Sequence, residues 1–311
     1  MAMAWVDRQS PEGDEIFYDH IGYFVPDLEI AGAQLEKLGF QVSDINIQYN
    51  ENAAGELHPT GTSNKLAKLN LGFIEVLAAT SESALADQLK SMLARYQGLH
   101  VIALTNPDMD ATARRLKEAG VEMQDAVHMR RKVMVNGEET LMVFTILRAK
   151  PGTYTEGRLQ ILTNHTPENF WLPGDMDHEN HADTLTDLLI CVEDVEEAVG
   201  RYETFFGIKA VTMAGLRTLD LARGRFHFVS RDQASALLPG FRAPTLPYTC
   251  GQGLGSRAIS ATKAYFGDAG IRPVFEDDGF YCIGPDDALG AYLLFHDKAL
   301  DAPWASLSER T

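Results

Sequence analysis

The stretch that decides the fold is YDHIGYFVPD, residues 18–27, in which an apolar strand carrying a histidine turns through Pro26 and Asp27. Residues 28–38 follow with apolar side chains at intervals of three and four, which predicts an amphipathic helix. Asp27 is a suitable N-cap, and Gly39 is suitable for the left-handed residue that ends a helix. We therefore expect a strand followed directly by a short, well-delimited helix.

The same phrase recurs three times, at residues 98–121, at 188–208 and, more faintly, at 256–271. Each copy precedes three strand-like runs, so the repeated unit is βαβββ. The expected strands are residues 40–47, 65–69 and 73–78, then 127–135, 140–147 and 158–163, then 210–214, 216–221 and 226–230, then 273–276, 280–284 and 291–296. Asn136-Gly137 predicts a tight hairpin turn between the first two strands of the second copy.

A segment rich in Pro, Asn, Asp and His separates the second copy from the third. This predicts an α+β protein of four βαβββ modules in two domains of two modules each. The expected divisions are an N-terminal domain at residues 14–165, a linker at 166–182 and a C-terminal domain at 183–300.

The composition limits the classes of partner. Among 311 residues, 44 are acidic and 27 are Lys or Arg, and the formal net charge is −17. That charge repels nucleic acids and anionic membranes, but a local cluster of cations can still bind a small anionic substrate. Three cysteines without CxxC spacing, no signal peptide and no apolar run of the ~18–20 residues that span a bilayer predict a cytoplasmic protein with reduced thiols.

Three further stretches carry a resemblance to a known family. They are residues 19–28, residues 61–77 with GTSN and GFIEVL, and residues 164–171 with NHTPENFW. With the four-module layout, the sequence resembles the vicinal oxygen chelate superfamily, and more narrowly its glyoxalase-like branch. The resemblance implies that two modules pair into a cup of curved mixed sheet. The superfamily contains lyases, isomerases, dioxygenases, epimerases and binding proteins without catalysis, so the fold alone does not define an activity.

The resemblance also implies where a divalent metal would bind, namely on the first and last strands of each module. Those positions are His20 and Glu75 in the first module and His100 and Gln160 in the second. Two imidazoles and one carboxylate suit Fe, Mn, Ni, Co or Zn and leave coordination positions open for substrate. The alternative is that each histidine is a hydrogen-bonded core residue, and the sequence leaves this open.

Other residues are candidates for catalysis and for contact with the substrate. His165 is an acid/base candidate at the cavity mouth, or a residue that caps the linker. Arg131 is a candidate clamp for a carboxylate or phosphate, or a charge that protects an edge strand. Phe73 and Trp171 suit a planar or apolar ligand, although core residues look the same.

The second half lacks a comparable set of ligands. Its first-strand positions carry Asp187 and, nearby, Cys250, and its last strands carry His227 and Leu294. We therefore expect the second domain to be a structural partner or a lid.

The expected activity is that of a metal-dependent lyase or isomerase acting on a small oxygenated metabolite that binds the ion through adjacent oxygens. Glu75 or His165 would move the proton. Two alternatives remain, an extradiol-type dioxygenase using the same N-terminal site and a non-catalytic small-molecule binding or resistance protein. A homodimer is compatible with the sequence.

Overall fold

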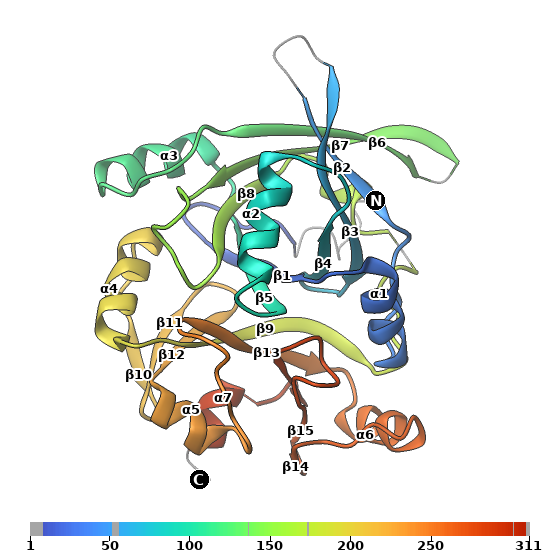
Figure 1. Cartoon of the computed structure of the whole chain (residues 1–311), viewed down its shortest axis with the longest axis vertical. Coiled ribbons are helices and arrows are strands. Elements are labelled where there is room, and N and C mark those ends of the chain that lie inside the picture. The colour runs from blue at the N-terminus through green and yellow to red at the C-terminus, as the bar shows by residue number, and fades with distance from the viewer. Residues whose placement is uncertain (1–8, 52–55, 136, 173, 301, 309–311) are drawn as a thin grey trace.

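The computed structural model describes residues 9–51, 56–135, 137–172, 174–300 and 302–308. Two mixed eight-stranded sheets, one from each half of the chain, form an α+β structure of two similar cups (Figure 1). The halves lie one above the other, with β1 and β5 of the first next to β9 and β13 of the second. The expected turn at Asn136-Gly137 includes a residue outside those described.

The first sheet has the strand order β2-β3-β4-β1-β5-β8-β7-β6. Each module contributes one half of this order, and the first strands of the two modules meet antiparallel at the centre. The strands are β1 (Phe17–Phe24), β2 (Asn46–Glu51), β3 (Leu57–Lys68), β4 (Phe73–Ala79), β5 (Gly98–Thr105), β6 (Val127–Val135), β7 (Glu138–Arg148) and β8 (Arg158–Asn164). The helices are α1 (Leu28–Lys37), α2 (Ala84–Leu93) and α3 (Met109–Glu118), with a 3₁₀ turn η2 (Pro167–Asn169) after β8.

The second sheet repeats this order as β10-β11-β12-β9-β13-β16-β15-β14. Its strands are β9 (Ala182–Cys191), β10 (Val211–Met213), β11 (Leu216–Asp220), β12 (Arg225–Val229), β13 (Tyr248–Ser256), β14 (Phe275–Asp277), β15 (Phe280–Ile283) and β16 (Tyr292–Asp297). Its helices are α4 (Val195–Phe206), α5 (Arg231–Leu237), α6 (Ile259–Asp268) and α7 (Pro303–Ser308). The prediction of four βαβββ modules is confirmed.

Local sequence explains where the helices begin and end. The Asp27 side chain accepts hydrogen bonds from the backbone N–H groups of Glu29 and Ile30, so it caps α1 as expected. Asp108 and Asp194 cap α3 and α4 in the same way. Gly39 follows α1 with a φ of 81°, a conformation that costs a glycine little.

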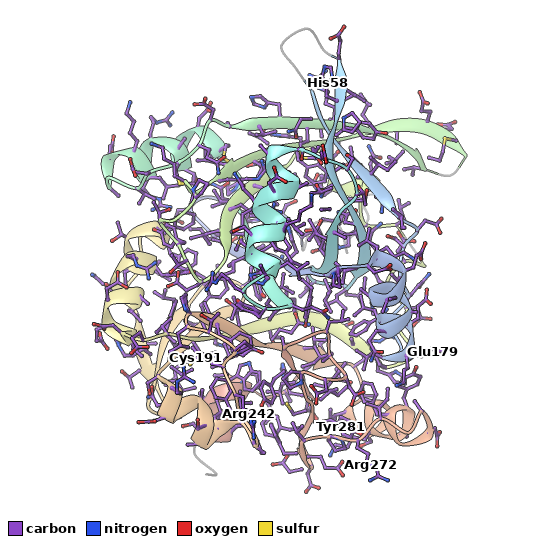
Figure 2. The ribbon with its side chains drawn as sticks, in the orientation of Figure 1. His58, Glu179, Cys191, Arg242, Arg272 and Tyr281 are labelled. Carbon is purple, nitrogen blue, oxygen red and sulfur yellow. The ribbon has the colours of Figure 1, made fainter. Side chains whose placement is uncertain are left out.

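Two strands differ from the prediction, since β2 begins later than residue 40 and β3 begins earlier than residue 65. The chain over residues 40–45 has no regular structure, and the strand begins only at Asn46. The β2 and β3 strands instead form a long hairpin that rises above the body, with His58 near its tip (Figures 1 and 2). Alternating side chains fit a strand but do not say how far a hairpin extends beyond the core.

Helix α2 is an element that the repeated phrase does not predict. It crosses the concave face of the first sheet in Figure 1, and its Leu89 packs with Phe24, Leu77, Val101 and Ala103. The helix therefore closes one end of the first cup, and the polar site lies beyond it.

The two halves share one hydrophobic core, which contains residues of both sheets. The Tyr18 ring contacts Phe226 edge to face, with ring centroids 5.1 Å apart. Backbone hydrogen bonds join the halves where Leu71 meets Asp183 and Leu185. No helix among the described residues is both long and apolar enough to cross a membrane.

Candidate functional site

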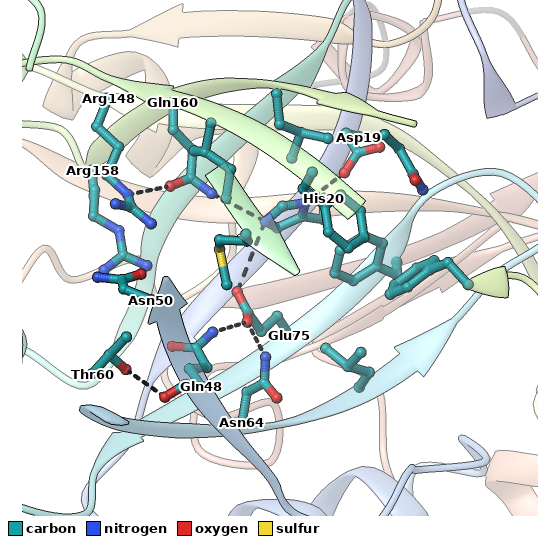
Figure 3. Close-up of a pocket in the computed structure, with 18 of the residues that line it drawn as sticks. Asp19, His20, Gln48, Asn50, Thr60, Asn64, Glu75, Arg148, Arg158 and Gln160 are labelled. Atoms are coloured by element: carbon teal, nitrogen blue, oxygen red, sulfur yellow. Dashed lines mark hydrogen bonds and ion pairs between the residues drawn. The ribbon is translucent and has the colours of Figure 1, made fainter. Parts of the chain in front are cut away.

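His20 lies at the centre of the first cup, on β1 and almost fully buried. Its Nδ1 is 2.6 Å from Asp19 Oδ2, and its ring stacks on Phe73 with centroids 4.2 Å apart. A carboxylate can only accept, so Nδ1 carries the proton and Nε2 faces the pocket with a lone pair. Figure 3 shows this imidazole between Asp19 and the other polar residues of the cup.

Glu75 projects from the neighbouring strand β4 toward the same point. Its Oε1 accepts hydrogen bonds from the Asn64 side chain and, at 3.3 Å, from Gln48 Nε2. Its Oε2 is 3.8 Å from His20 Nε2. One oxygen of the carboxylate is thus held in place while the other faces the pocket.

Gln160 on β8 completes this central group. Its Oε1 accepts from Arg148 Nε at 3.3 Å, and its Nε2 is 3.4 Å from His20 Nε2. A guanidinium only donates, so the amide oxygen must face Arg148 and the amide N–H must face the imidazole. The hydrogen bonds therefore run in one direction, from Arg148 through Gln160 and His20 to Asp19.

Two buried cations line the same pocket. Burial and, less strongly, the nearby Arg158 lower the pKa of Arg148 to about 10, with Glu75 opposing the shift. Burial also lowers the pKa of Arg158, and Glu75 opposes that shift. Both groups keep their charge at neutral pH. Neither guanidinium forms a salt bridge with a described residue, and Arg158 lies over the Phe24 ring at 5.4 Å.

The pocket encloses a cavity of about 110 Å³, and it has a cationic end and an aromatic end. Arg148 and Arg158 lie at the first end; the second is lined by Phe73, Phe144, Phe170 and Trp171. Four of the residues that line it have a buried polar atom without a partner in the described structure, namely Asn64 Oδ1, Arg158 Nε, Asn164 Nδ2 and Trp171 Nε1. Three of these atoms are donors, so the pocket suits a ligand rich in acceptor oxygens.

His100 does not join this group. Its Nε2 is 2.8 Å from the Tyr96 carbonyl oxygen, and its ring stacks on Tyr96 and Phe24 away from the residues that line the pocket. The pairing of β1 with β5 passes from Gly22–Val101 to Tyr23–Leu99, so His100 is skipped at a register shift. The expected convergence of His20, Glu75 and His100 is thus corrected: His100 is a hydrogen-bonded core residue.

Val101 occupies the position in the second module that corresponds to His20. In the first module, Glu75 pairs with Gly22, which follows His20 by two residues. In the second module, Gln160 pairs with Ala103, which follows Val101 by two residues. Successive side chains of a strand point to opposite faces, so an offset of one residue removes a side chain from the site. The histidine that the sequence offers is one residue away from the position that faces the cup.

The other predicted residues are distributed as follows. Phe73 and Trp171 line the pocket. His165 does not; its Nε2 is 2.9 Å from Thr145 Oγ1, and it lines a separate hollow. The backbone of Arg131 in β6 pairs with Met142 of β7, but the Arg131 side chain lies outside the described residues.

Sequence reasoning missed the two arginines, although alternation along β8 offered a signal. Arg158 precedes Gln160 by two residues and so shares its face. Arg148 could not be found in this way, because it faces Gln160 through the pairing of β7 with β8.

The donor groups do not fit a divalent ion. At the four expected ligand positions, Glu75 offers one carboxylate oxygen, His20 Nε2 faces an amide N–H, Gln160 directs its amide oxygen at Arg148, and Val101 has no atom that can bind an ion. Catalytic metal sites typically use three protein ligands. Among the described residues, no three His, Cys, Asp or Glu side chains are grouped to hold an ion.

The corresponding region of the second sheet is filled. Asp187 and His227 are fully buried and form a pair, with His227 Nε2 2.8 Å from Asp187 Oδ1. Trp304 of α7 packs into the concave face with residues of α5, and a Cβ on Gly251 would lie 3.0 Å from its ring. The pair is therefore a buried structural contact.

Comparisons with known proteins agree with this architecture. A family model described as "Glyoxalase-like domain" matches residues 18–206. A hypothetical protein from Staphylococcus aureus is similar in structure, with a TM-score of 0.61 and 14% identity, over 91% of this chain and 99% of that one. A mutant of 4-hydroxymandelate synthase from Streptomyces coelicolor has a TM-score of 0.56 and 13% identity, over 96% of this chain and 99% of that one. At such identities the likeness concerns the fold alone. The comparison with curated proteins gives no match.

Proposed function

Because this chain belongs to the glyoxalase-like domain family, we propose that its first cup binds a small oxygenated carboxylate and transfers a proton at the carbon beside it, as an isomerase or lyase does. The observation that carries this proposal is the presence of Arg148 and Arg158 in one buried pocket with Glu75, without a salt bridge to either arginine from a described residue.

The two guanidiniums support an anionic ligand. A buried cation without a partner is costly, and a carboxylate that accepts hydrogen bonds from it offsets part of the cost of burial. Arg158 Nε in particular is buried and has no partner. The net charge of the chain is negative, so this local positive pair is what would attract and orient an anion.

Glu75 is the group suited to move the proton. Asn64 and Gln48 hold its Oε1, and Oε2 points into the pocket toward His20. After the substrate carboxylate binds the arginines, Oε2 would remove a proton from the adjacent carbon. The carboxylate oxygens would carry the negative charge of the resulting enediolate, which the guanidiniums stabilise. In an isomerase Glu75 would return the proton to the same carbon, and in a lyase a substituent on the next carbon would leave with the electron pair. His20, held between Asp19 and Gln160, is a positioning residue in this scheme.

The length of the pocket indicates how the ligand would lie. Arg158 and Asn164 are six residues apart on β8, roughly 20 Å along the strand. The carboxylate would lie at the arginine end, the reacting carbon near Glu75, and an apolar or planar group against Phe73 and Phe170.

Exchange of C–H for C–D in D₂O tests the proposed chemistry without knowledge of the full reaction. A panel of small 2-hydroxy acids, which carry a hydrogen on the carbon beside the carboxylate, is incubated with the protein, and loss of that proton signal is followed by NMR. At least one acid is expected to exchange, and Glu75→Gln is expected to slow that exchange by about 10²- to 10⁴-fold, as for loss of a general base.

Arg148→Met is the matched variant for binding, because it keeps an unbranched apolar stem and removes the charge. It should weaken binding of the same acid, whereas Glu75→Gln should leave binding nearly unchanged. Binding of acids without any exchange would contradict the catalytic proposal and favour the non-catalytic binding protein instead. Consumption of O₂ in the presence of these acids would favour the dioxygenase.

A further inference from the structure

We propose that this pocket operates without a divalent metal ion and that Arg148 and Arg158 provide the positive charge that an ion would provide. The role given to the arginines rests on the proposed function; the absence of a metal-binding donor set does not. The inference comes from four positions related by the pairing of β1 with β4 and of β5 with β8, namely His20, Glu75, Val101 and Gln160.

Val101 carries methyl groups at the position where the first module has the imidazole of His20. It is fully buried and packs with Leu89 of α2. A Cβ on Gly22 would lie 2.6 Å from the Val101 Cβ, so these two residues face each other closely on the concave side. Val101 therefore presents methyl groups and no atom that could bind an ion.

Arg148 determines the orientation of the Gln160 side-chain amide. Because Arg148 donates to its Oε1, the amide presents N–H to His20 Nε2. A cation at that place would meet the positive end of the amide dipole. If the amide were turned over, its NH₂ would face the guanidinium of Arg148. Both groups are hydrogen-bond donors, so this orientation is unfavourable.

The two arginines lie next to Val101 and Gln160 in the sheet. Arg158 is paired with Val101 across β8 and β5, and Arg148 is paired with Gln160 across β7 and β8. Val101 and Gln160, the two positions that offer no atom to a metal ion, are thus each paired with an arginine in the sheet. A divalent cation among these groups would be repelled by two buried positive charges, whereas an anionic ligand would be attracted to them.

Metal content is the direct test. Protein prepared without a histidine tag is incubated separately with excess Mn²⁺, Fe²⁺, Co²⁺, Ni²⁺ or Zn²⁺, desalted, and analysed by mass spectrometry of the elements. We expect far less than one ion per chain in every case. About one ion per chain that His20→Ala loses would overturn the proposal.

Two variants test whether Val101 and Gln160 are the reason that the pocket binds no metal ion. Val101→His should create an imidazole donor, and Gln160→Glu should create a second carboxylate; the double variant should retain about one Co²⁺ or Zn²⁺ per chain. Gln160→Glu alone keeps the test possible if Val101→His does not fold by circular dichroism. A folded double variant that gains no ion would contradict the assignment of these positions.

The arginine role is tested with benzoate and its uncharged match benzamide, by ligand-observed NMR titration in the presence of EDTA. We expect benzoate to bind in EDTA as it does without EDTA, and Arg158→Met to weaken benzoate by about tenfold or more while changing benzamide little. Loss of benzoate binding in EDTA would overturn the proposal. If the protein retains no metal and benzoate does not bind, the proposed function and the arginine role fail while the metal-free assignment stands.

Discussion

At the scale of single residues, the site depends on which face of a strand each side chain occupies. His20 and His100 both lie on the opening strand of the repeated phrase, yet only His20 enters the pocket. The register shift beside Gly22 offsets His100 by one residue. An imidazole left outside the cup behaves as a core residue. Burial lowers the pKa of His100 to about 4, and that of His178 likewise to about 4.

This burial predicts a pH dependence of stability. An unfolded histidine binds a proton below about pH 6.5, whereas folded His100 stays neutral down to about pH 4. The unfolded state therefore binds more protons within this window, and the free energy of unfolding falls as the pH is lowered from 6.5 toward 4. One such residue lowers the free energy of unfolding by about 3 kcal/mol over this pH range.

His100→Gln keeps a donor for the Tyr96 carbonyl and removes the titrating group. We expect the free energy of unfolding of this variant, measured by urea denaturation from pH 7 to pH 4, to fall less steeply than that of the parent protein. His58→Gln, at the exposed hairpin tip in Figure 2, is the control and should keep the parental slope. Equal slopes for all three proteins would argue against a depressed pKa at His100.

At the scale of elements, α2 determines how much of the cup remains open. Its Leu89 is 1% exposed and covers Phe24, Leu77 and Val101, so the polar site is confined to the part of the concave face beyond the helix. Ser83 caps α2 by accepting from the Ala86 backbone N–H. In the second half, α5 and α7 occupy the concave face more completely, which leaves Asp187 and His227 as a closed pair.

Leu89→Ala should therefore lower the free energy of unfolding by about 2–5 kcal/mol, as for other buried leucines. Ser91→Ala, at an exposed position of the same helix, should change it by less than about 0.5 kcal/mol. Chemical denaturation of both variants measures the difference. A small effect of Leu89→Ala would mean that α2 does not close the cup by packing.

At the scale of the whole molecule, the two halves share one hydrophobic core. The shared core, the contact of Tyr18 with Phe226, and hydrogen bonds such as Arg95 to the Pro247 carbonyl at 2.9 Å join them. The first sheet thus packs against the second half, and the candidate site described above lies in the first cup.

Calorimetry should accordingly show one unfolding transition, with the calorimetric enthalpy equal to the van't Hoff enthalpy. Leu89→Ala in the first half and Phe228→Leu in the second should both lower the temperature of that same transition. Two separate peaks, each shifted by only one of the variants, would show that the halves unfold independently.

The sequence by itself determined the modules, because capping aspartates, the glycine that ends α1 and apolar periodicity are local signals that act within a few residues. The resemblance to a known superfamily also indicated His20, Glu75 and Gln160, together with His100. Only the tertiary structure decided that Val101 replaces His100 at the fourth position and that Arg148 and Arg158 lie beside it. The reason is that strand register depends on pairing between segments far apart in the chain, and a shift of one residue reverses the face of every side chain that follows.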